Sequence, residues 1–475
     1  MKYKTTLLAA VLATLSLSAS AQQTTVNILS VNDMHATIEQ MPRLAFVADS
    51  LRAIDPDLIV LSAGDNRTGN PYNDRFEISS YPMVALMNAV GFDASAVGNH
   101  EWDSNTTGLR TIANLASFPF ICCNAIAPDT MNIGFKPFTI LHANGLNIGV
   151  IGTLQTNVNG IPDSHPKNLR GMTFKPASTV IPQYLSLRDK CDVLLLLSHE
   201  GYEEDIKTAG LFPQFDAIIG GHSHTLVAEN EFHNNVLITQ AKNKLKYAFL
   251  TTITLDGGKV VNRSSKQIPL TNGGGINKDV ERLMKLMMQN PELEKKVVDV
   301  ASDFQNAEEL GSMVCDALAS ATNCDIALQN GGGVRFSTFP AGPMTLSDVL
   351  RLDPFGNEAI IYEITGKEVA DLILNCFDID EKQIPYASGI KYEMTIDKNL
   401  KPTGIKIRNL DGSKFDMKRT YRFVTNSYVS AILPAPKSDP GSNTFRACSD
   451  YVLDYFQSHP SIDYQGTHRA EIIKK

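Results

Sequence analysis

Side chains that can bind metal ions stand directly after short apolar segments, or in a compact motif, at five places in the first half of the chain. In chain order, these places read Asp33-Met34-His35, Gly64-Asp65, Gly98-Asn99-His100-Glu101-Trp102-Asp103, Ser198-His199-Glu200 and Gly221-His222-Ser223-His224. Mixed carboxylate, imidazole and amide ligands suit Zn²⁺, Mn²⁺ or iron better than Mg²⁺ or Ca²⁺. The groups are too many for one ordinary site. They fit two ions about 3.5–4 Å apart, an arrangement used for displacement at phosphorus.

These side chains meet only if the apolar segments are neighbouring strands. Segments 26–31, 58–61, 148–151, 193–197 and 217–219 are each about strand length and nearly continuous in apolar character, as buried strands are. Residues 79–90 carry Met83, Leu86, Met87 and Val90 at helical spacing. Because ligands of α/β sheets gather at the carboxyl ends of the strands, the pattern predicts an α/β fold with the metal site at that edge.

Each fragment alone is a weak signal. A lone Asp-x-His occurs by chance, His199 could only hydrogen-bond in a core, and the histidines of 221–224 could be surface residues. All five fragments nevertheless stand in one domain, in strand-like surroundings. The joint pattern therefore favours a metal centre.

The second half of the chain follows a glycine-rich break. Thr271-Asn272-Gly273-Gly274-Gly275 predicts a linker, and the amphipathic helix after it ends at Asn290-Pro291. We therefore expect a first domain over 22–270, a linker and connecting helix over 271–292, and a second domain over 293–475.

Composition and charge narrow the class of protein. Hydrophobic residues make up 43% of the 475 residues, which favours large cores, and the net charge of −8 argues against binding nucleic acid polymers. Residues 1–21 combine a basic start, an apolar stretch over 7–17 and Ala19-Ser20-Ala21. They predict a signal peptide and an exported protein, periplasmic or secreted. The apolar stretch is shorter than the about 20 residues of a membrane span, and no later segment is a candidate.

The seven cysteines give little chemistry. An odd number of cysteines in an exported protein leaves at least one thiol free or paired with another chain. None of the cysteines has CxxC spacing, which argues against a zinc site built from cysteines. We expect most of them to be small core residues, with one disulfide as an open alternative.

Both halves of the chain carry motifs that resemble one enzyme family. Asp33-x-His35, Gly64-Asp65, Gly98-Asn99-His100-Glu101-x-Asp103, His199 and Gly221-His222-x-His224 are similar to the calcineurin-like metallophosphoesterase pattern. Asn330-Gly331-Gly332-Gly333-Val334-Arg335 and Pro354-Phe355-Gly356-Asn357 resemble the C-terminal domain of 5′-nucleotidases. The likeness covers essentially the whole chain after residue 21. It implies a four-layer metallophosphoesterase sandwich followed by a separate α/β nucleotide-binding domain.

The resemblance implies a role for each motif residue. Two divalent ions (Zn, Mn, Fe or Co) would be held by two sets of ligands, Asp33 with His35 and His224, and Asn99 with His199 and His222. Asp65 would bridge the ions, which would activate water as a hydroxide nucleophile. His100 would stabilise negative charge on the phosphate or the leaving oxygen. Asp103 would fix the tautomer of His100 and raise its basicity.

In the second domain, the resemblance implies a site for the nucleoside. Arg335 would contact phosphate or ribose, and Asn330 with its glycines would allow close backbone approach. Phe355 and Tyr428 would stack on the two faces of a base, with ordinary core packing as the alternative. Three segments depart from the family pattern: 302–304 lacks an Arg, 429–434 replaces a Gly-Gly-Asp-Gly turn, and 66–70 replaces an aromatic-Gln-Gly sequence.

The sequence therefore predicts hydrolysis of nucleoside 5′-monophosphates to nucleoside and phosphate. UDP-sugars and 2′,3′-cyclic nucleotides stay open as substrates, because two metal ions serve all of these reactions. A nucleotide-binding or surface-binding protein without turnover is the alternative of another class, and the complete ligand set argues against it. The expected partner is a small nucleotide, and the oligomeric state is open.

Overall fold

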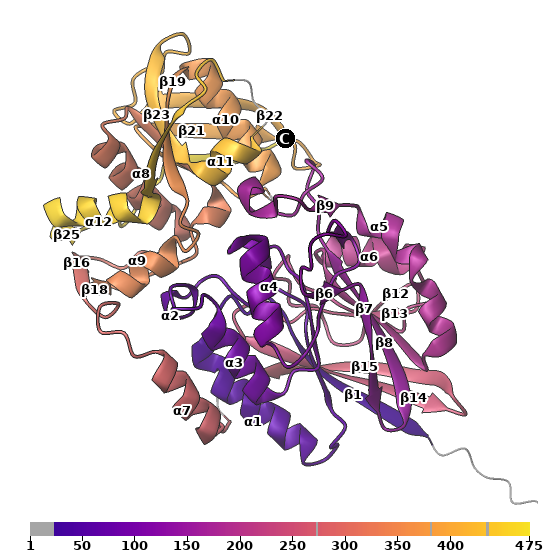
Figure 1. Ribbon diagram of the computed structural model, residues 1–475. Coiled ribbons are helices and arrows are strands. Elements are labelled where there is room, and N and C mark those ends of the chain that lie inside the picture. The colour runs from indigo at the N-terminus through magenta and orange to yellow at the C-terminus, as the bar shows by residue number, and fades with distance from the viewer. Residues whose placement is uncertain (1–22, 272–273, 381, 434–436) are drawn as a thin grey trace, which may run out of the picture.

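The computed structural model describes residues 23–271, 274–380, 382–433 and 437–475. The expected signal peptide over 1–21 and residues 272 and 273 of the expected linker lie outside these ranges. The described residues form two α/β units, with the second above the first in Figure 1.

Two β-sheets form the centre of the first domain. One sheet has the strand order β15-β14-β1-β2-β3-β4-β6, and the other has the order β12-β13-β11-β10-β8-β7. The strands of the first sheet are β1 (Thr24–Val31), β2 (Ile59–Ser62), β3 (Ala94–Ala96), β4 (Phe120–Ile121), β6 (Phe135–Lys136), β14 (Tyr247–Asp256) and β15 (Lys259–Pro269). The strands of the second sheet are β7 (Phe138–Ala143), β8 (Leu146–Leu154), β10 (Val193–His199), β11 (Ala217–Ile219), β12 (Glu231–His233) and β13 (Val236–Thr239).

Apolar packing places these sheets between two layers of helices. Ile28 and Leu61 of the first sheet share a buried cluster with Val150 and Leu195 of the second. Helices α1 (Met41–Arg52), α3 (Tyr81–Val90) and α4 (Asn105–Leu115) pack on the outer face of the first sheet, and α6 (Tyr202–Leu211) packs on the outer face of the second. The helix–sheet–sheet–helix order is the four-layer sandwich that the sequence predicts (Figure 1).

The strands that precede the predicted ligands run in parallel. Strands β1, β2 and β3 pair in parallel in one sheet, and β8, β10 and β11 pair in parallel in the other. All five apolar segments of the sequence lie on strands, except that β2 begins one residue after Leu58. The predicted helix over 79–90 is α3, which begins at Tyr81 and has its four apolar residues buried. Parallel strands bring their carboxyl ends to one edge of each sheet.

Helix α7 (Lys278–Met287) follows the linker and stops before Asn290, as the sequence predicts. This helix packs against α1 and α3 of the first domain. Val280 is buried in the cluster that α1 and α3 build, and Leu283 and Met284 pack against the same cluster. The connecting helix therefore belongs to the packing of the first domain.

The second domain contains three small sheets with helices around them. The central sheet has the order β20-β17-β23-β19-β24, and the others have the orders β22-β21-β26 and β18-β16-β25. Its strands are β16 (Lys296–Val300), β17 (Ile326–Gln329), β18 (Gly342–Thr345), β19 (Glu358–Thr365), β20 (Tyr386–Ser388), β21 (Ile390–Ile396), β22 (Pro402–Asn409), β23 (Thr420–Asn426), β24 (Ser442–Ala447), β25 (Ser461–Ile462) and β26 (Ala470–Lys474). Its main helices are α8 (Ala307–Thr322), α9 (Leu346–Leu352), α10 (Gly366–Ile379), α11 (Ser427–Ile432) and α12 (Cys448–Ser458).

All seven cysteines lie within the described residues and are free thiols. Six are buried and Cys324 is half-buried. They are core residues, as most were expected to be, and the alternative of a disulfide is not met. Within the described ranges, no helix combines the length and the apolar character that crossing a membrane requires.

Candidate active site

The seven predicted metal ligands come together where segments from both sheets of the first domain meet. Asp33, Asp65 and His199 are at most 1% exposed. Five of the seven have positive φ angles although none is glycine: Asp33 (48°), His35 (45°), Asp65 (54°), His222 (78°) and His224 (53°). Such backbone costs about 1–3 kcal/mol per residue and clusters at functional sites. The surrounding fold holds the backbone in this conformation, in which the side chains of these residues converge.

The first set of ligands is compact. The Nε2 atoms of His35 and His224 are 2.9 Å apart, and His224 Nε2 is 3.5 Å from Asp33 Oδ1. Asn243 Nδ2 lies 3.1 Å from His224 Nδ1, so this amide supports the ring from behind. Asp33, His35 and His224 have ligand atoms near enough to hold one ion.

The second set gathers around the side-chain oxygen of Asn99. This oxygen is 3.1 Å from His199 Nε2 and 3.0 Å from His222 Nδ1. Asn99 Nδ2 donates to the backbone oxygen of Asp163 at 3.0 Å, which turns Oδ1 toward the two imidazoles. His199 Nδ1 lies 2.6 Å from the carbonyl oxygen of Ala63, so its Nε2 is the atom that faces the site.

Asp65 lies between these sets. Its Oδ2 is 3.3 Å from His199 Nε2 and 3.8 Å from His100 Nε2. Asp65 belongs to two candidate groups, one with His35 and His100 and one with Asp33 and His199. Burial opposes its ionisation, but the charges of His199 and His100 outweigh burial and hold the pKa of Asp65 well below its usual value. An ionised carboxylate in this position is suited to bridge two cations.

The chemistry of this cluster fits metal ions. Buried carboxylates and imidazoles are costly unless charge compensates them. Asp33 and Asp65 supply buried negative charge, and the histidines and Asn99 present nitrogen and oxygen atoms at 2.9–3.1 Å from one another. Two divalent cations would neutralise the carboxylates and separate the imidazoles that crowd one another here.

His100 and Asp103 form a pair beside the predicted ligands. His100 Nδ1 lies 2.8 Å from Asp103 Oδ2, and the His100 ring is buried. Burial lowers the pKa of His100. The negative charges of Asp65 and Asp103 raise this pKa by more than burial lowers it, so the pKa of His100 is above its usual value. The carboxylates of Asp65 and Asp103 therefore stabilise the charged form of the ring relative to its neutral form.

Glu101 lies in the motif of residues 98–103 but received no role from the sequence. This fully buried carboxylate accepts hydrogen bonds from the backbone nitrogens of Asp65, Asn66 and Gly98 at 2.9, 2.8 and 2.6 Å. A Cβ at Gly98 would lie 2.2 Å from Asp65 Oδ1, so only glycine fits there. Glu101 thus joins the two loops that carry Asp65 and Asn99.

Asp163 and Asn243 are further site residues to which the sequence assigned no role. Asp163 Oδ2 lies 3.8 Å from His222 Nε2, and its Oδ1 accepts a hydrogen bond from Asn157 Nδ2 at 2.9 Å. Both residues come from irregular segments with no periodic pattern and no motif. No signal in the single sequence points to them.

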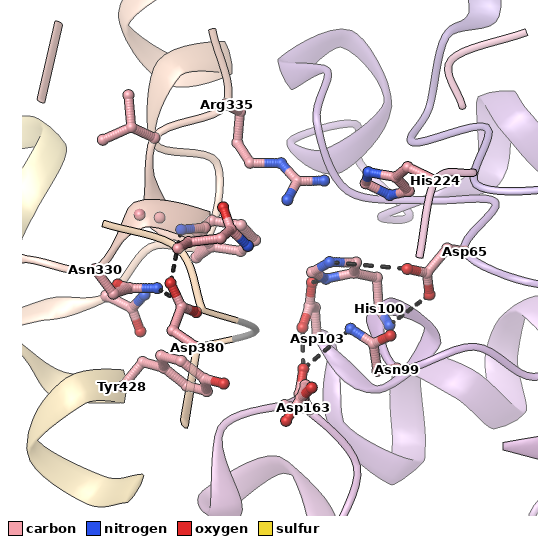
Figure 2. Close-up of a pocket in the computed structure, with 18 of the residues that line it drawn as sticks. Asp65, Asn99, His100, Asp103, Asp163, His224, Asn330, Arg335, Asp380 and Tyr428 are labelled. Atoms are coloured by element: carbon pink, nitrogen blue, oxygen red, sulfur yellow. Dashed lines mark hydrogen bonds and ion pairs between the residues drawn. The ribbon is translucent and has the colours of Figure 1, made fainter. Parts of the chain in front are cut away.

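The predicted nucleoside-binding residues line the same cavity as the metal cluster. Asn330, Arg335, Phe355 and Tyr428 border a cavity of about 470 Å³ together with residues of the first domain. Figure 2 shows Asn330 and Tyr428 with Asp380 on one side, and Asp65, Asn99 and His100 on the other. Asp380 had no predicted role, and its carboxylate accepts hydrogen bonds from Asn330 Nδ2 at 3.1 Å and Gly332 N at 2.9 Å.

Two of these residues contact the first domain directly. The Phe355 ring stacks on His100, with centroids 5.6 Å apart and planes at 21°. Arg335 Nη2 lies 3.1 Å from His35 Nε2, and its guanidinium is 5.7 Å from the centroid of the Phe355 ring. The expected stacking of a base between Phe355 and Tyr428 stays a prediction, and in this structure the observed stacking partner of Phe355 is His100.

Known proteins match both halves of the chain. The family model described as calcineurin-like phosphoesterase matches residues 26–226, and the model described as 5′-nucleotidase, C-terminal domain matches residues 288–431. The trifunctional nucleotide phosphoesterase protein YfkN of Bacillus subtilis is 27% identical over 86% of this chain, which spans only 32% of that longer protein. A 5′-nucleotidase of Vibrio cholerae is 27% identical, with 97% of this chain and 96% of that protein covered.

Solved structures share the fold. The 5′-nucleotidase precursor from Thermus thermophilus superposes with a TM-score of 0.82 over 95% of this chain and 99% of that one, at 22% identity.

Fold, ligand cluster and matches together define a metal-dependent phosphoester hydrolase of the calcineurin-like class, which uses two divalent ions. Within that class, the chain belongs to the 5′-nucleotidase family.

Proposed function

We propose that the protein hydrolyses nucleoside 5′-monophosphates to nucleoside and phosphate. The observation that carries this proposal is the shared cavity. Four of the seven metal-ligand side chains border one space together with four residues of the second domain: Asp65, Asn99, His222 and His224, and Asn330, Arg335, Phe355 and Tyr428. A phosphate at the metal ligands would thus have its nucleoside within reach of the second domain. The similarity to nucleotide-hydrolysing relatives supports the same substrate class.

We assign the metal ligands as the family resemblance implies them. Asp33, His35 and His224 would hold one ion, Asn99, His199 and His222 would hold the other, and both ions would share Asp65. When bound, two such ions supply Lewis-acid activation of water and neutralise phosphate charge.

The chain's own residues perform the remaining steps. His100, held at 2.8 Å by Asp103, donates a hydrogen bond from Nε2 to a phosphate oxygen or to the leaving 5′-oxygen. Phe355 stacks on one face of the His100 ring and shields that face from water. Arg335 contacts Nε2 of His35, which has a single lone pair in its neutral form and cannot serve an ion and a guanidinium together. Arg335 would therefore turn toward the substrate phosphate when His35 holds an ion.

The experiment that tests this function is hydrolysis of a panel of substrates with added Mn²⁺, Zn²⁺ or Co²⁺, with the products separated by chromatography, because a cyclic nucleotide or a UDP-sugar gives phosphate monoesters and no free phosphate in its first hydrolysis. The panel contains nucleoside 5′-monophosphates, UDP-glucose, 2′,3′-cyclic nucleotides and p-nitrophenyl phosphate. The proposal expects the highest kcat/KM for a 5′-monophosphate. A clear preference for a cyclic nucleotide or a UDP-sugar would replace it. From residues 1–21 we also propose that the protein works outside the cytoplasm, which N-terminal sequencing of the mature protein tests by showing a start after Ala21.

A further inference from the structure

The segment 221–225, which carries two of the proposed metal ligands, is held by one buried side chain from outside the segment. Gln240 directly follows β13 and is fully buried. Its Nε2 donates a hydrogen bond to the backbone oxygen of Gly221 at 2.9 Å. Its Oε1 accepts hydrogen bonds from Ser223 Oγ at 2.9 Å and from Thr225 N at 2.5 Å. A single amide group therefore holds the two ends and the middle of this segment.

The two histidines of the segment alternate with the three residues that Gln240 holds. His222 Nδ1 lies 3.0 Å from Asn99 Oδ1, and His224 Nε2 lies 2.9 Å from His35 Nε2. One histidine therefore belongs to the second set of ligands and the other belongs to the first set. Because both rings are attached to one short segment, a shift of that segment would displace a ligand in each set.

The backbone of the segment is strained and lies close to a further ligand. His222 and His224 have φ angles of 78° and 53°, which non-glycine residues rarely adopt and which persist only where the surrounding structure holds them. A Cβ at Gly221 would lie 3.0 Å from His199 Nδ1, so the segment has little room on that side. The hydrogen bonds of Gln240 therefore oppose a relaxation that would move both histidine rings.

We propose that Gln240 is a positioning residue that links the two metal sites, because it fixes His222 for one ion and His224 for the other. The inference rests on the ligand assignment made under the proposed function. Residues that orient metal ligands typically contribute about 10- to 100-fold in metal affinity. Each of the two histidines serves one ion, whereas Gln240 acts on a ligand of each ion. Loss of its amide should therefore weaken the binding of both ions in one variant.

The test is equilibrium dialysis of the metal-free protein against Mn²⁺ or Co²⁺ in the absence of nucleotide. Circular dichroism checks that each variant is folded at the temperature of the dialysis. Gln240→Met replaces the amide by an apolar side chain of similar length, and we expect it to weaken the binding of both ions about 10- to 100-fold. His224→Ala, which removes a ligand of one ion, should weaken chiefly the binding of that ion.

A matched control and a milder variant accompany this comparison. Gln267 donates from Nε2 to the backbone oxygen of Val227 at 2.7 Å, and none of its hydrogen bonds within the described residues reaches the segment 221–225. Gln267→Met should therefore bind both ions as the wild type does. Ser223→Ala removes one of the three contacts of Gln240 and should weaken both ions by a smaller factor. The double variant with Gln240→Met should match Gln240→Met alone to within roughly twofold.

Two results would overturn the inference. A folded Gln240→Met protein that binds both ions with wild-type affinity would show that Gln240 only stabilises the fold, even if the melting temperature falls. Weaker binding of one ion alone would confine Gln240 to one site. If Gln240→Met does not fold, Ser223→Ala decides the question, and wild-type affinity of that variant for both ions would refute the link.

The same experiment separates this inference from the proposed function. Wild-type protein that binds two ions but does not hydrolyse AMP would refute the proposed substrate, and the positioning role of Gln240 would stand on the affinities alone. Wild-type protein that binds fewer than two ions would refute the ligand assignment and the inference with it.

Discussion

Asp103→Asn should slow turnover of nucleoside monophosphates while both metal ions stay bound. Asp103 is not among the proposed ligands, and its carboxylate contacts His100 Nδ1 at 2.8 Å. Asparagine can also place its amide N–H against Nδ1. That contact would favour the His100 tautomer whose proton is on Nε2. A neutral asparagine would also no longer raise the pKa of His100 as the charge of Asp103 does.

The magnitude follows from the contact that is lost. A hydrogen bond to a charged group is worth about 1.5–3 kcal/mol, which corresponds to a loss of about 10- to 150-fold in kcat. His100→Asn removes the donor itself and should cost about 10²–10⁴-fold. Because Asp103 acts through His100, the double variant should be no slower than His100→Asn, within the roughly twofold scatter of such cycles.

The assay is phosphate release from AMP at saturating metal, with the ion content of each variant measured by elemental analysis. Losses that multiply in the double variant would show that Asp103 acts independently of His100. Loss of ions from His100→Asn would make His100 a ligand, which its contacts with His35 and Asp65 also allow.

Three further changes test separate parts of the site. Asp65→Ala should remove both ions, because both sets of ligands approach this carboxylate, and a variant that retains two ions by elemental analysis would contradict the shared role. Tyr428→Ala should lower kcat/KM for AMP about 5- to 150-fold with little effect on p-nitrophenyl phosphate, whereas Phe355→Ala should affect both substrates because its ring also covers His100; equal effects of Tyr428→Ala on both substrates would mean that Tyr428 only packs. Burial raises the pKa of Asp353 to about 7, above the about 3.9 of an unfolded chain, so the fold loses stability as pH rises between these values. Asp353→Asn should therefore raise the melting temperature at pH 8 and change it little near pH 4, and an equal shift at both pH values would refute the burial effect.

The convergence of the proposed ligands could be predicted from the sequence because these residues lie beside short buried strands. Asp33, Asp65 and Asn99 follow strands of one sheet, and His199 and His222 end or follow strands of the other. The parallel pairing of those strands converts spacing along the chain into proximity in space. For these residues, the local sequence pattern was sufficient to predict that their side chains converge.

Other features depend on long-range packing that a local pattern does not contain. Asp163 reaches Asn99 and His222 from an irregular segment, and its place depends on how that segment folds back over the sheet edge. The contacts of Phe355 with His100 and of Arg335 with His35 depend on how the two domains meet. The amphipathic pattern of α7 predicted a helix but could not tell that its apolar side packs on the first domain.

The measurement that tests the central claim most directly is AMP hydrolysis by the metal-free protein and by the same preparation after metal is restored. Chelation and dialysis, with elemental analysis to show less than one ion per chain, should abolish phosphate release. Addition of Mn²⁺, Zn²⁺ or Co²⁺ should restore it as two ions per chain bind, because the attacking water is activated at neutral pH by the ions. Full turnover of AMP by protein shown to be free of metal would contradict the account.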